Sequence, residues 1–359
     1  MSPLQMSCSV YKRLLDRGWR RSGDYLYKPN LKESCCPQYT IKLDAMNFKL
    51  SRNQRKALNK WNKFLIYGDQ EKATASTTKE TPPLVDLVHA ADASVVESKG
   101  NTPVHRFEVT VEPSSFTDEK YQLYLQYQES VHADTGNTPS GFKRFLVESA
   151  IRLEPIIYKN PPAKSSPYPL PTHYGSYHQM YRVDGKLIAI GVIDILPGCV
   201  SSVYFMYAEG WGSWSLGKIS AIREVTLAKE LHDAGADIVD SLYMGFYIHT
   251  CPKMKYKGEY DPSYLLDPES YTWHPLKDCI PLLDKHKYIT FNEAKADQDM
   301  LSHEDIERMQ AVSSVSGGTI KVAPLLTRPM WSNSYSRKQI EETVKTFGKG
   351  LKDEIIISS

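Results

Sequence analysis

Two carboxylates stand in segments that are otherwise apolar. Asp194 lies beside Ile193 in the run Lys186–Leu196, and Glu224 lies beside Arg223 in a helix-like segment. Burying a lone carboxylate is costly, so each must be paired, exposed or functional. Strand alternation places Asp194 opposite Ile193, so it could simply face water, and Glu224 could be exposed or form a structural ion pair. A functional carboxylate in such a place can act as a general acid or base.

Aromatic and basic side chains are interleaved in the stretch 247–258. Tyr247 and His249 open it, and Lys253, Lys255 and Lys257 follow. This mixture suits the end of a nucleic acid or a ribose phosphate. A surface loop with no such role has the same composition.

Two further basic groups lie near the N-terminus. Arg20 and Arg21 form one group with Lys28. Segment 51–65 predicts a helix that Ser51 caps and that carries an apolar stripe. Its opposite face holds five basic residues, which either bind an anionic partner or form a solvated helix face: Arg52, Arg55, Lys56, Lys60 and Lys63.

The cysteines predict little on their own. Six in 359 residues are too sparse for a disulfide scaffold. Cys35 and Cys36 are adjacent and could supply half of a four-cysteine metal site, or be unrelated. Cys8 is a poor ligand candidate. The other three are isolated and are expected to be buried structural thiols: Cys199, Cys251 and Cys279.

Standard catalytic motifs are missing from the sequence. It contains no Walker loop, no G-x-S-x-G elbow, no H-E-x-x-H and no dinucleotide-binding G-x-G-x-x-G. The glycine-rich loop 210–217 precedes a helix and could hold an anion. A tight strand-to-helix turn explains the same glycines.

Composition sets the broad class. Hydrophobic residues make up 41% and the formal net charge is only +2, so any nucleic-acid contact must use local patches. No stretch approaches a membrane span and the N-terminus has no apolar signal region. We therefore expect a protein of the cytoplasm, with the nucleus as a second location, and no membrane partner.

The elements that must position these residues predict an α+β fold. Segments 186–196 and 200–207 read as strands, 215–234 as a buried helix and 238–248 as another strand, which favours a mixed sheet with a packed helix. We divide the chain into an N-terminal domain 1–67, a flexible linker 68–105, a catalytic domain 106–290 and a peripheral extension 291–359.

Several long motifs resemble the eukaryotic arginyl-tRNA–protein transferases. The N-terminal ones are GWRRSG from Gly18, YKP from Tyr27 and SCCPQYTI from Ser34. The C-terminal ones include DGKLIAIGVIDILPGC from Asp184 and YIHTCPKMKYK from Tyr247. The likeness covers roughly residues 10–65 and 105–290.

The resemblance implies a reaction and a fold. Family members transfer arginine from charged tRNA to the N-terminal amine of proteins that begin with Asp, Glu or oxidised Cys, which marks them for ubiquitin-dependent degradation. The implied fold is like that of the GCN5-related N-acetyltransferases. The partners are arginyl-tRNA and proteins with acidic N-termini, and we expect a monomer.

The resemblance also implies roles in the reaction for individual residues. Asp194 is the first candidate and Glu224 the second for the group that handles the amine proton. Arg20, Arg21 and Lys28 are candidates for the acceptor's acidic side chain, and further substrate-binding candidates are Tyr243, Tyr247 and His249. The expected tRNA contacts are basic: Arg55, Lys56, Lys60, Lys253, Lys255 and Lys257.

The cysteine pattern departs from the family. Members carry an upstream C-x-x-C pair that, with the later Cys-Cys, is taken to hold an iron–sulfur cluster or a metal such as zinc. That pair is missing before Trp19, so Cys35 and Cys36 form an incomplete site, and we expect transfer to need no cofactor. Two other functions stay open: a CoA-dependent N-acetyltransferase, and a non-catalytic module that binds degrons or RNA.

Overall fold

The N-terminal part of the chain supplies both a small hairpin and a strand of the main sheet. The computed structural model describes residue 3 and residues 5–68, 82–161, 169–236, 238–292 and 301–357. The N-terminal elements are α1 (Cys8–Leu15), β1 (Arg20–Ser22), β2 (Tyr25–Tyr27), β3 (Tyr39–Asp44) and α2 (Arg52–Tyr67). The predicted helix is confirmed as α2, where Ser51 and Gln54 form a capping box.

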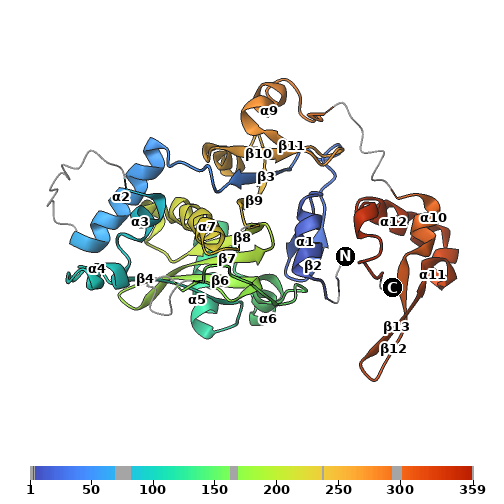
Figure 1. Ribbon diagram of the computed structural model, residues 1–359, viewed down its shortest axis with the longest axis horizontal. Helices are drawn as coiled ribbons and strands as arrows, with labels where there is room; N and C mark the ends of the chain where they lie inside the picture. The colour runs from blue at the N-terminus through green and yellow to red at the C-terminus, as the bar shows by residue number, and fades with distance from the viewer. Residues whose placement is uncertain are drawn as a thin grey trace.

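A nine-stranded mixed sheet organises the molecule (Figure 1). Its strands run in the order β11-β10-β3-β9-β8-β7-β6-β4, with β5 added on β6. The remaining strands are β4 (Phe107–Pro113), β5 (Glu154–Pro155), β6 (His173–Val183), β7 (Lys186–Leu196), β8 (Cys199–Tyr207), β9 (Ser241–Tyr247), β10 (Ser263–Leu266) and β11 (Trp273–Pro275). Strand β3 lies between β10 and β9, so residues 1–67 and 106–290 share one sheet.

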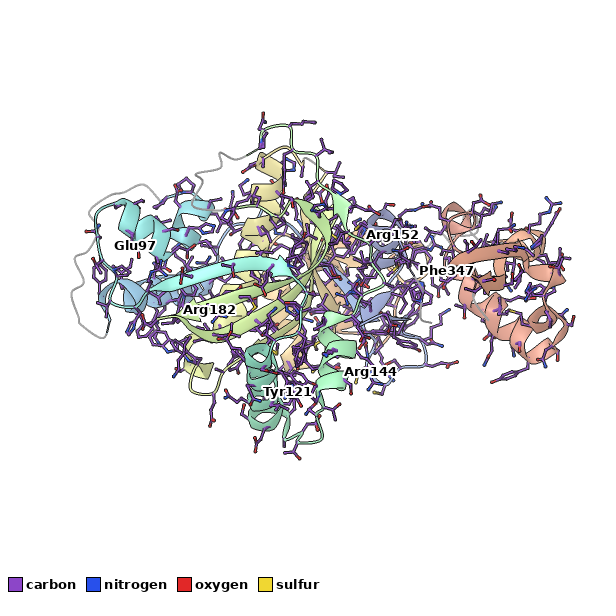
Figure 2. All side chains as sticks on the ribbon, turned by 90° about the horizontal axis from the view of Figure 1, so that it is seen from below. Glu97, Tyr121, Arg144, Arg152, Arg182 and Phe347 are labelled. Atoms are coloured by element: carbon purple, nitrogen blue, oxygen red, sulfur yellow. The ribbon has the colours of Figure 1, made fainter. Side chains whose placement is uncertain are left out.

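Helices cover both faces of the sheet, which accounts for its near-continuous burial. Helix α7 (Leu216–Asp233) packs on β8 and β9, with α2 and α3 (Leu84–His89) against it (Figure 1). Helix α5 (Asp118–His132), α6 (Pro139–Phe142) and the π-helical turn η1 (Lys143–Val147) lie on the opposite face, where Figure 2 places Tyr121 and Arg144. Such double coverage gives an α+β architecture with a mixed sheet.

The linker prediction fails for part of its range. Residues 69–81 lie outside the described part of the chain, but α3 and α4 (Ala93–Ser98) follow them. Val88, Val95 and Val96 are buried in these short helices. Their apolar spacing outweighs the polar composition of the preceding segment, because burying such side chains favours order.

Parallel pairing between β8 and β9 is brief. It joins Cys199 to Ser241, Val200 to Leu242 and Ser201 to Tyr243, and no further pairs continue it in the described strands. Beyond β9 the chain forms α8 (Pro252–Lys255), η3 (Tyr256–Glu259) and, after β11, α9 (Leu276–Leu283). Strands that part in this way leave a gap that side chains or a ligand must fill.

The C-terminal residues form a separate lobe against α1. It contains α10 (His303–Arg308), the hairpin β12 (Gln310–Ser316) and β13 (Thr319–Pro324), α11 (Pro329–Ser332) and α12 (Ser334–Lys345), red in Figure 1. The Trp19 and Phe347 rings lie 5.4 Å apart, and Arg17 Nε donates to the Thr346 carbonyl at 2.8 Å. No helix in the described ranges is both long and apolar enough to span a membrane.

Candidate active site

A cavity opens where β8 and β9 separate, and we call it the β8–β9 cleft. Its volume is about 510 Å³. Residues of β8, β9, α7, α5, the β1–β2 hairpin and the 253–260 segment line it. Elements far apart in the sequence therefore meet at one site, as is typical of ligand pockets.

Glu224 places a carboxyl group in the wall of the cleft. It lies on α7, is only 2% exposed and accepts a hydrogen bond from the Ser220 hydroxyl at 2.8 Å. Burial raises the pKa of Glu224 to about 7. A carboxyl group with such a pKa can take up and release a proton near neutral pH, as a general base must.

Arg20 is a buried cation in the same cleft. Its Nη1 donates to the Trp19 carbonyl and its Nη2 to the Gly245 carbonyl, both at 3.1 Å. Its Nε has no acceptor, and no described carboxylate pairs with its guanidinium. Burial lowers the pKa of Arg20. A buried guanidinium without a counter-ion is costly, so the arrangement suits an incoming anion.

Lys257 is a second cation of the cleft. Its Nζ donates to the Phe246 carbonyl at 2.9 Å, and burial, together with the charge of Arg20, lowers the pKa of Lys257 to about 8. No carboxylate in the described ranges forms an ion pair with it. Arg20 and Lys257 therefore approach one region of the cleft where a negative group would be stabilised.

Asp194 lies beneath the cleft and not at its surface. It accepts two hydrogen bonds from Arg21, at 2.8 and 2.6 Å, and one from the Ser176 hydroxyl at 2.7 Å. Its side chain is 0% exposed. The idea that Asp194 faces water is wrong, because α1 covers this face of β7. Asp194 thus orients Arg21, which lines the cleft.

The three other substrate-binding candidates do not line the cleft. Tyr243 hydrogen-bonds Asp16 of the α1 C-terminus. Tyr247 hydrogen-bonds His249, whose other ring nitrogen meets Asp284 at 2.7 Å. Side chains alternate across a strand, so Tyr243 and Tyr247 share a face of β9, whereas Met244 and Phe246 line the cleft.

The predicted acid-binding trio is divided between two sites. Arg20 and Arg21 line the β8–β9 cleft, whereas Lys28 lines a different pocket with Arg17. Of the predicted tRNA lysines in the 253–257 stretch, Lys253 and Lys257 line the cleft and Lys255 does not. The structure therefore places Lys28 apart from Arg20 and Arg21, and Lys255 apart from Lys253 and Lys257.

The basic face of α2 is a distinct surface. Five basic residues of the helix line one shallow hollow there, and the Lys60 ammonium lies 4.7 Å from the Trp214 ring centroid. Trp214 belongs to the loop before α7. The surface is thus next to the loop that leads to the cleft, and we keep the name basic face of α2 for Arg52, Arg55, Lys56, Lys60 and Lys63.

The cysteine pair does not make a metal centre with the described residues. The Cys35 and Cys36 sulfurs are 3.4 Å apart and Cys35 is exposed. No group of three or more potential ligands gathers anywhere in the described ranges. Two thiolates cannot complete a four-ligand site, so these residues do not fit a cluster or a structural zinc. Cys199 and Cys279 are buried as expected, whereas Cys251 is half-buried.

Sequence reasoning missed the contact of Glu224 with Ser220 and the approach of Lys257 to Arg20. Ser220 precedes Glu224 by four residues, a helical spacing that brings side chains together and could have signalled the contact. The approach of Lys257 to Arg20 had no such local signal, because it depends on how the 253–260 segment folds back over β9.

Comparison with known protein families identifies the class of enzyme to which this protein belongs. The model described as arginine-tRNA-protein transferase, N terminus, matches residues 1–56, and the corresponding C-terminus model matches residues 119–267. These matches cover the β1–β2 hairpin, β8, α7 and β9, which build the cleft. The protein is thus an aminoacyl-tRNA transferase enzyme.

Individual relatives narrow this class to one family. Arginyl-tRNA–protein transferase 1 of Drosophila melanogaster is 32% identical over 89% of this chain and 86% of its own length. An aspartate/glutamate leucyltransferase of Pseudomonas fluorescens is 27% identical over 73% and 81%. The chain therefore belongs to the arginyl-tRNA–protein transferase family. Among solved structures, L-PGS from Bacillus licheniformis aligns with a TM-score of only 0.28 at 13% identity, over 65% of this chain and 48% of its own.

Proposed function

We propose that the β8–β9 cleft joins arginine, delivered as arginyl-tRNA, to the N-terminal amine of proteins that begin with Asp, Glu or oxidised Cys. The observation that carries the proposal is a pair of cations, the buried Arg20 and the half-buried Lys257, in a cleft that also holds Glu224. The product would be marked for ubiquitin-dependent degradation.

The reaction needs positioning and proton transfer more than a covalent nucleophile. The acceptor nitrogen attacks the ester carbonyl, the N–C bond forms, and the ester C–O bond breaks with the tRNA ribose oxygen as leaving group. Glu224 takes the proton from the attacking amine and returns it to that oxygen. Its pKa of about 7 suits both steps.

Selection of acidic N-termini would use the two cations. An Asp or Glu carboxylate, or the oxidised sulfur acid of Cys, places negatively charged oxygens only a few bonds from the reacting amine, four in Asp and oxidised Cys and five in Glu. Arg20 and Lys257 both line the cleft, and neither has a carboxylate partner among the described residues. Removing either should therefore weaken acidic acceptors more than neutral ones.

The tRNA would lie along the basic face of α2. A net charge of +2 leaves binding to local patches, and this helix face is the densest one on a single described helix. Lys60 of this face contacts Trp214, and the loop that holds Trp214 connects the helix to the cleft. Lys253 at the cleft could meet the terminal phosphates.

The short parallel contact of β8 and β9 supports a finer fold assignment. We assign the fold to a GCN5-related N-acetyltransferase-like architecture, in which two parallel strands part and leave a substrate cleft. We also propose that the protein acts as a monomer in the cytoplasm or nucleus.

The test is single-turnover transfer from labelled arginyl-tRNA to peptides that differ only in their first residue. We expect an Asp peptide to exceed an Ala peptide, and Lys257→Met to erase much of that preference, by roughly the 10-fold that a charge-assisted hydrogen bond supplies. Lys186→Met, an exposed lysine at the start of β7, is the control. Equal transfer to both peptides, or acetylation from acetyl-CoA instead, would contradict the proposal.

A further inference from the structure

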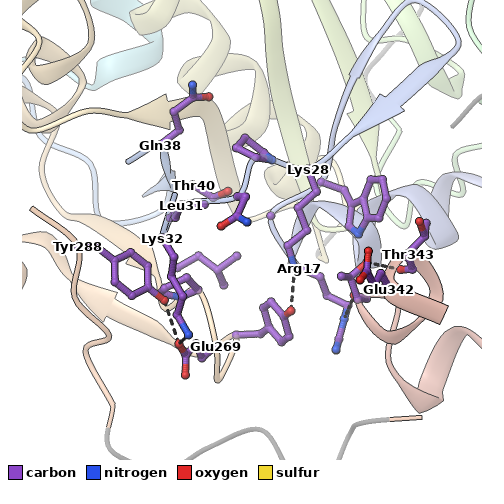
Figure 3. Close-up of a pocket in the computed structure, with 18 of the residues that line it drawn as sticks. Arg17, Lys28, Leu31, Lys32, Gln38, Thr40, Glu269, Tyr288, Glu342 and Thr343 are labelled. Atoms are coloured by element: carbon purple, nitrogen blue, oxygen red, sulfur yellow. Dashed lines mark hydrogen bonds and ion pairs between the residues drawn. The ribbon is translucent and has the colours of Figure 1, made fainter. Parts of the chain in front are cut away.

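A second polar pocket lies between the β1–β2 hairpin and the C-terminal lobe, and we call it the N-terminal pocket. Its volume is about 700 Å³, within the usual range for small-molecule sites. Figure 3 shows Lys28 reaching into it between Glu269 on one side and Glu342 with Thr343 on the other. None of its lining residues lines the β8–β9 cleft.

Two cations of this pocket, Lys28 and Arg17, lie close to one tyrosine ring. The Lys28 ammonium donates to the Tyr271 hydroxyl at 2.7 Å and lies 4.4 Å from the centroid of that ring. No carboxylate of the described chain pairs with Lys28. The Arg17 guanidinium lies 4.2 Å from the same ring centroid, so two cations converge on Tyr271.

An independent sign comes from Trp19. This residue lines the pocket, is 5% exposed, and its indole N–H finds no acceptor within the described ranges. A buried donor without an acceptor costs free energy that a ligand oxygen would recover. The acids nearby are already engaged or peripheral, since Glu269 binds Lys32 at 2.5 Å and accepts from the Tyr288 hydroxyl, while Glu342 lies on the exposed face of α12.

We propose that the N-terminal pocket binds a small organic phosphate, with Lys28 and the Trp19 indole N–H as its principal contacts. Lysine is a frequent phosphate ligand because it is a compact charge, and a phosphate can accept from several donors at once. The tyrosine and leucine side chains of the walls give the organic part a surface to contact: Leu31, Leu266, Tyr271 and Tyr288. The cavity is too small for a nucleic-acid duplex.

A ligand bound in the N-terminal pocket would influence the β8–β9 cleft through the β1–β2 hairpin. Arg20 pairs with Tyr27 across β1 and β2, and both line the β8–β9 cleft. Trp19 and Lys28 are the residues next to that pair. The proposal does not rest on the reaction, so binding can be measured without transfer.

Binding should be coupled to a proton. Burial, together with the charge of Arg17, lowers the pKa of Lys28 to about 7. A phosphate favours the charged ammonium and raises that pKa, so binding above pH 7 takes up a proton and weakens as pH rises. The other titratable or charged groups that face the pocket are Arg17, Lys32, Glu269, Tyr271, Tyr288 and Glu342.

Calorimetric titration of the full chain with AMP and with inorganic phosphate tests the proposal. We expect AMP to bind more tightly than phosphate, and Lys28→Met to weaken AMP by about 10-fold or more, as for a lost charge-assisted hydrogen bond. Lys186→Met should bind as the unchanged chain does. Unchanged affinity in Lys28→Met, or equal affinity for AMP and phosphate, would overturn the proposal.

Two measurements on the unchanged chain remove dependence on how the variant folds. Titrations at about pH 8 in buffers of different ionisation enthalpy should show proton uptake that approaches one per AMP, given the lowered pKa of Lys28. Uptake of no proton would contradict a role for Lys28. AMP should still bind in the presence of saturating deacylated tRNA, and loss of AMP binding would assign the phosphate site to tRNA instead.

Discussion

Replacing Glu224 with Gln should remove activity and stabilise the protein at the same time. The substitution keeps the side-chain shape and an oxygen that can still accept the Ser220 hydroxyl hydrogen bond. It removes the ionisable group that we place at the attacking amine. Transfer should fall by about 10²-fold or more, within the range that general acid–base groups contribute.

The stability change follows from the pKa of Glu224. Folding raises that pKa from 4.5 to about 7, so the folded state holds the proton more tightly than the unfolded state. Ionisation of this carboxyl group therefore does not lower the free energy of unfolding below about pH 4.5. Above that pH it lowers the free energy of unfolding by a growing amount as the pH rises to about 7. At 1.36 kcal/mol per pKa unit, the full cost is on the order of 3 kcal/mol.

Urea denaturation at two pH values measures this difference. Glu224→Gln should raise the free energy of unfolding by up to about 3 kcal/mol near pH 8 and by little near pH 4.5. Glu209→Gln is the control, because Glu209 is exposed in the loop after β8. Stabilisation of the same size at both pH values would refute the linkage argument. Unchanged transfer by Glu224→Gln would refute its role as the base.

Three further outcomes follow from the site. Asp194→Asn should destabilise the fold by about 3–5 kcal/mol in urea denaturation, because it leaves the buried Arg21 charge without its partner; normal stability with lost transfer would restore Asp194 as a catalytic residue. Neutralising the basic face of α2 should flatten the salt dependence of tRNA affinity, by about 0.7–0.9 in log–log slope per phosphate contact, and an unchanged slope would exclude that face. Metal analysis should find less than one tightly held metal per chain at the Cys35–Cys36 pair; one chelator-resistant equivalent would show that other ligands complete the site.

Local sequence patterns were sufficient for several elements. The capped amphipathic segment that became α2, and the apolar run that became α7, depend on interactions within a few residues. The Asp184–Gly185 turn joins β6 and β7 with both residues at positive φ, as the dipeptide predicts. Burial of α7 also follows from its apolar residues on most faces, although the sequence left open whether Glu224 itself is exposed.

The assignment of the carboxylates required the tertiary structure. Asp194 and Arg21 are 173 residues apart, so no periodicity could have joined them. The alternation rule expects one water-exposed face, and it fails for β7 because α1 and the opposite helices cover both faces. Asp194 is therefore buried and orients Arg21, whereas Glu224 lines the cleft.

The sequence by itself determined the family, the order of the principal elements and the residue types that the reaction needs, because these depend on motifs and on periodicity along the chain. Only the tertiary structure decided which basic residues act together. Arg20 and Lys257 meet because β9 parts from β8 and the following segment folds back, whereas Lys28, only eight positions beyond Arg20, lies in another pocket. Electrostatic interactions weaken with distance in space and not with distance in sequence. The set of residues that line the cleft could therefore not be derived from the sequence alone.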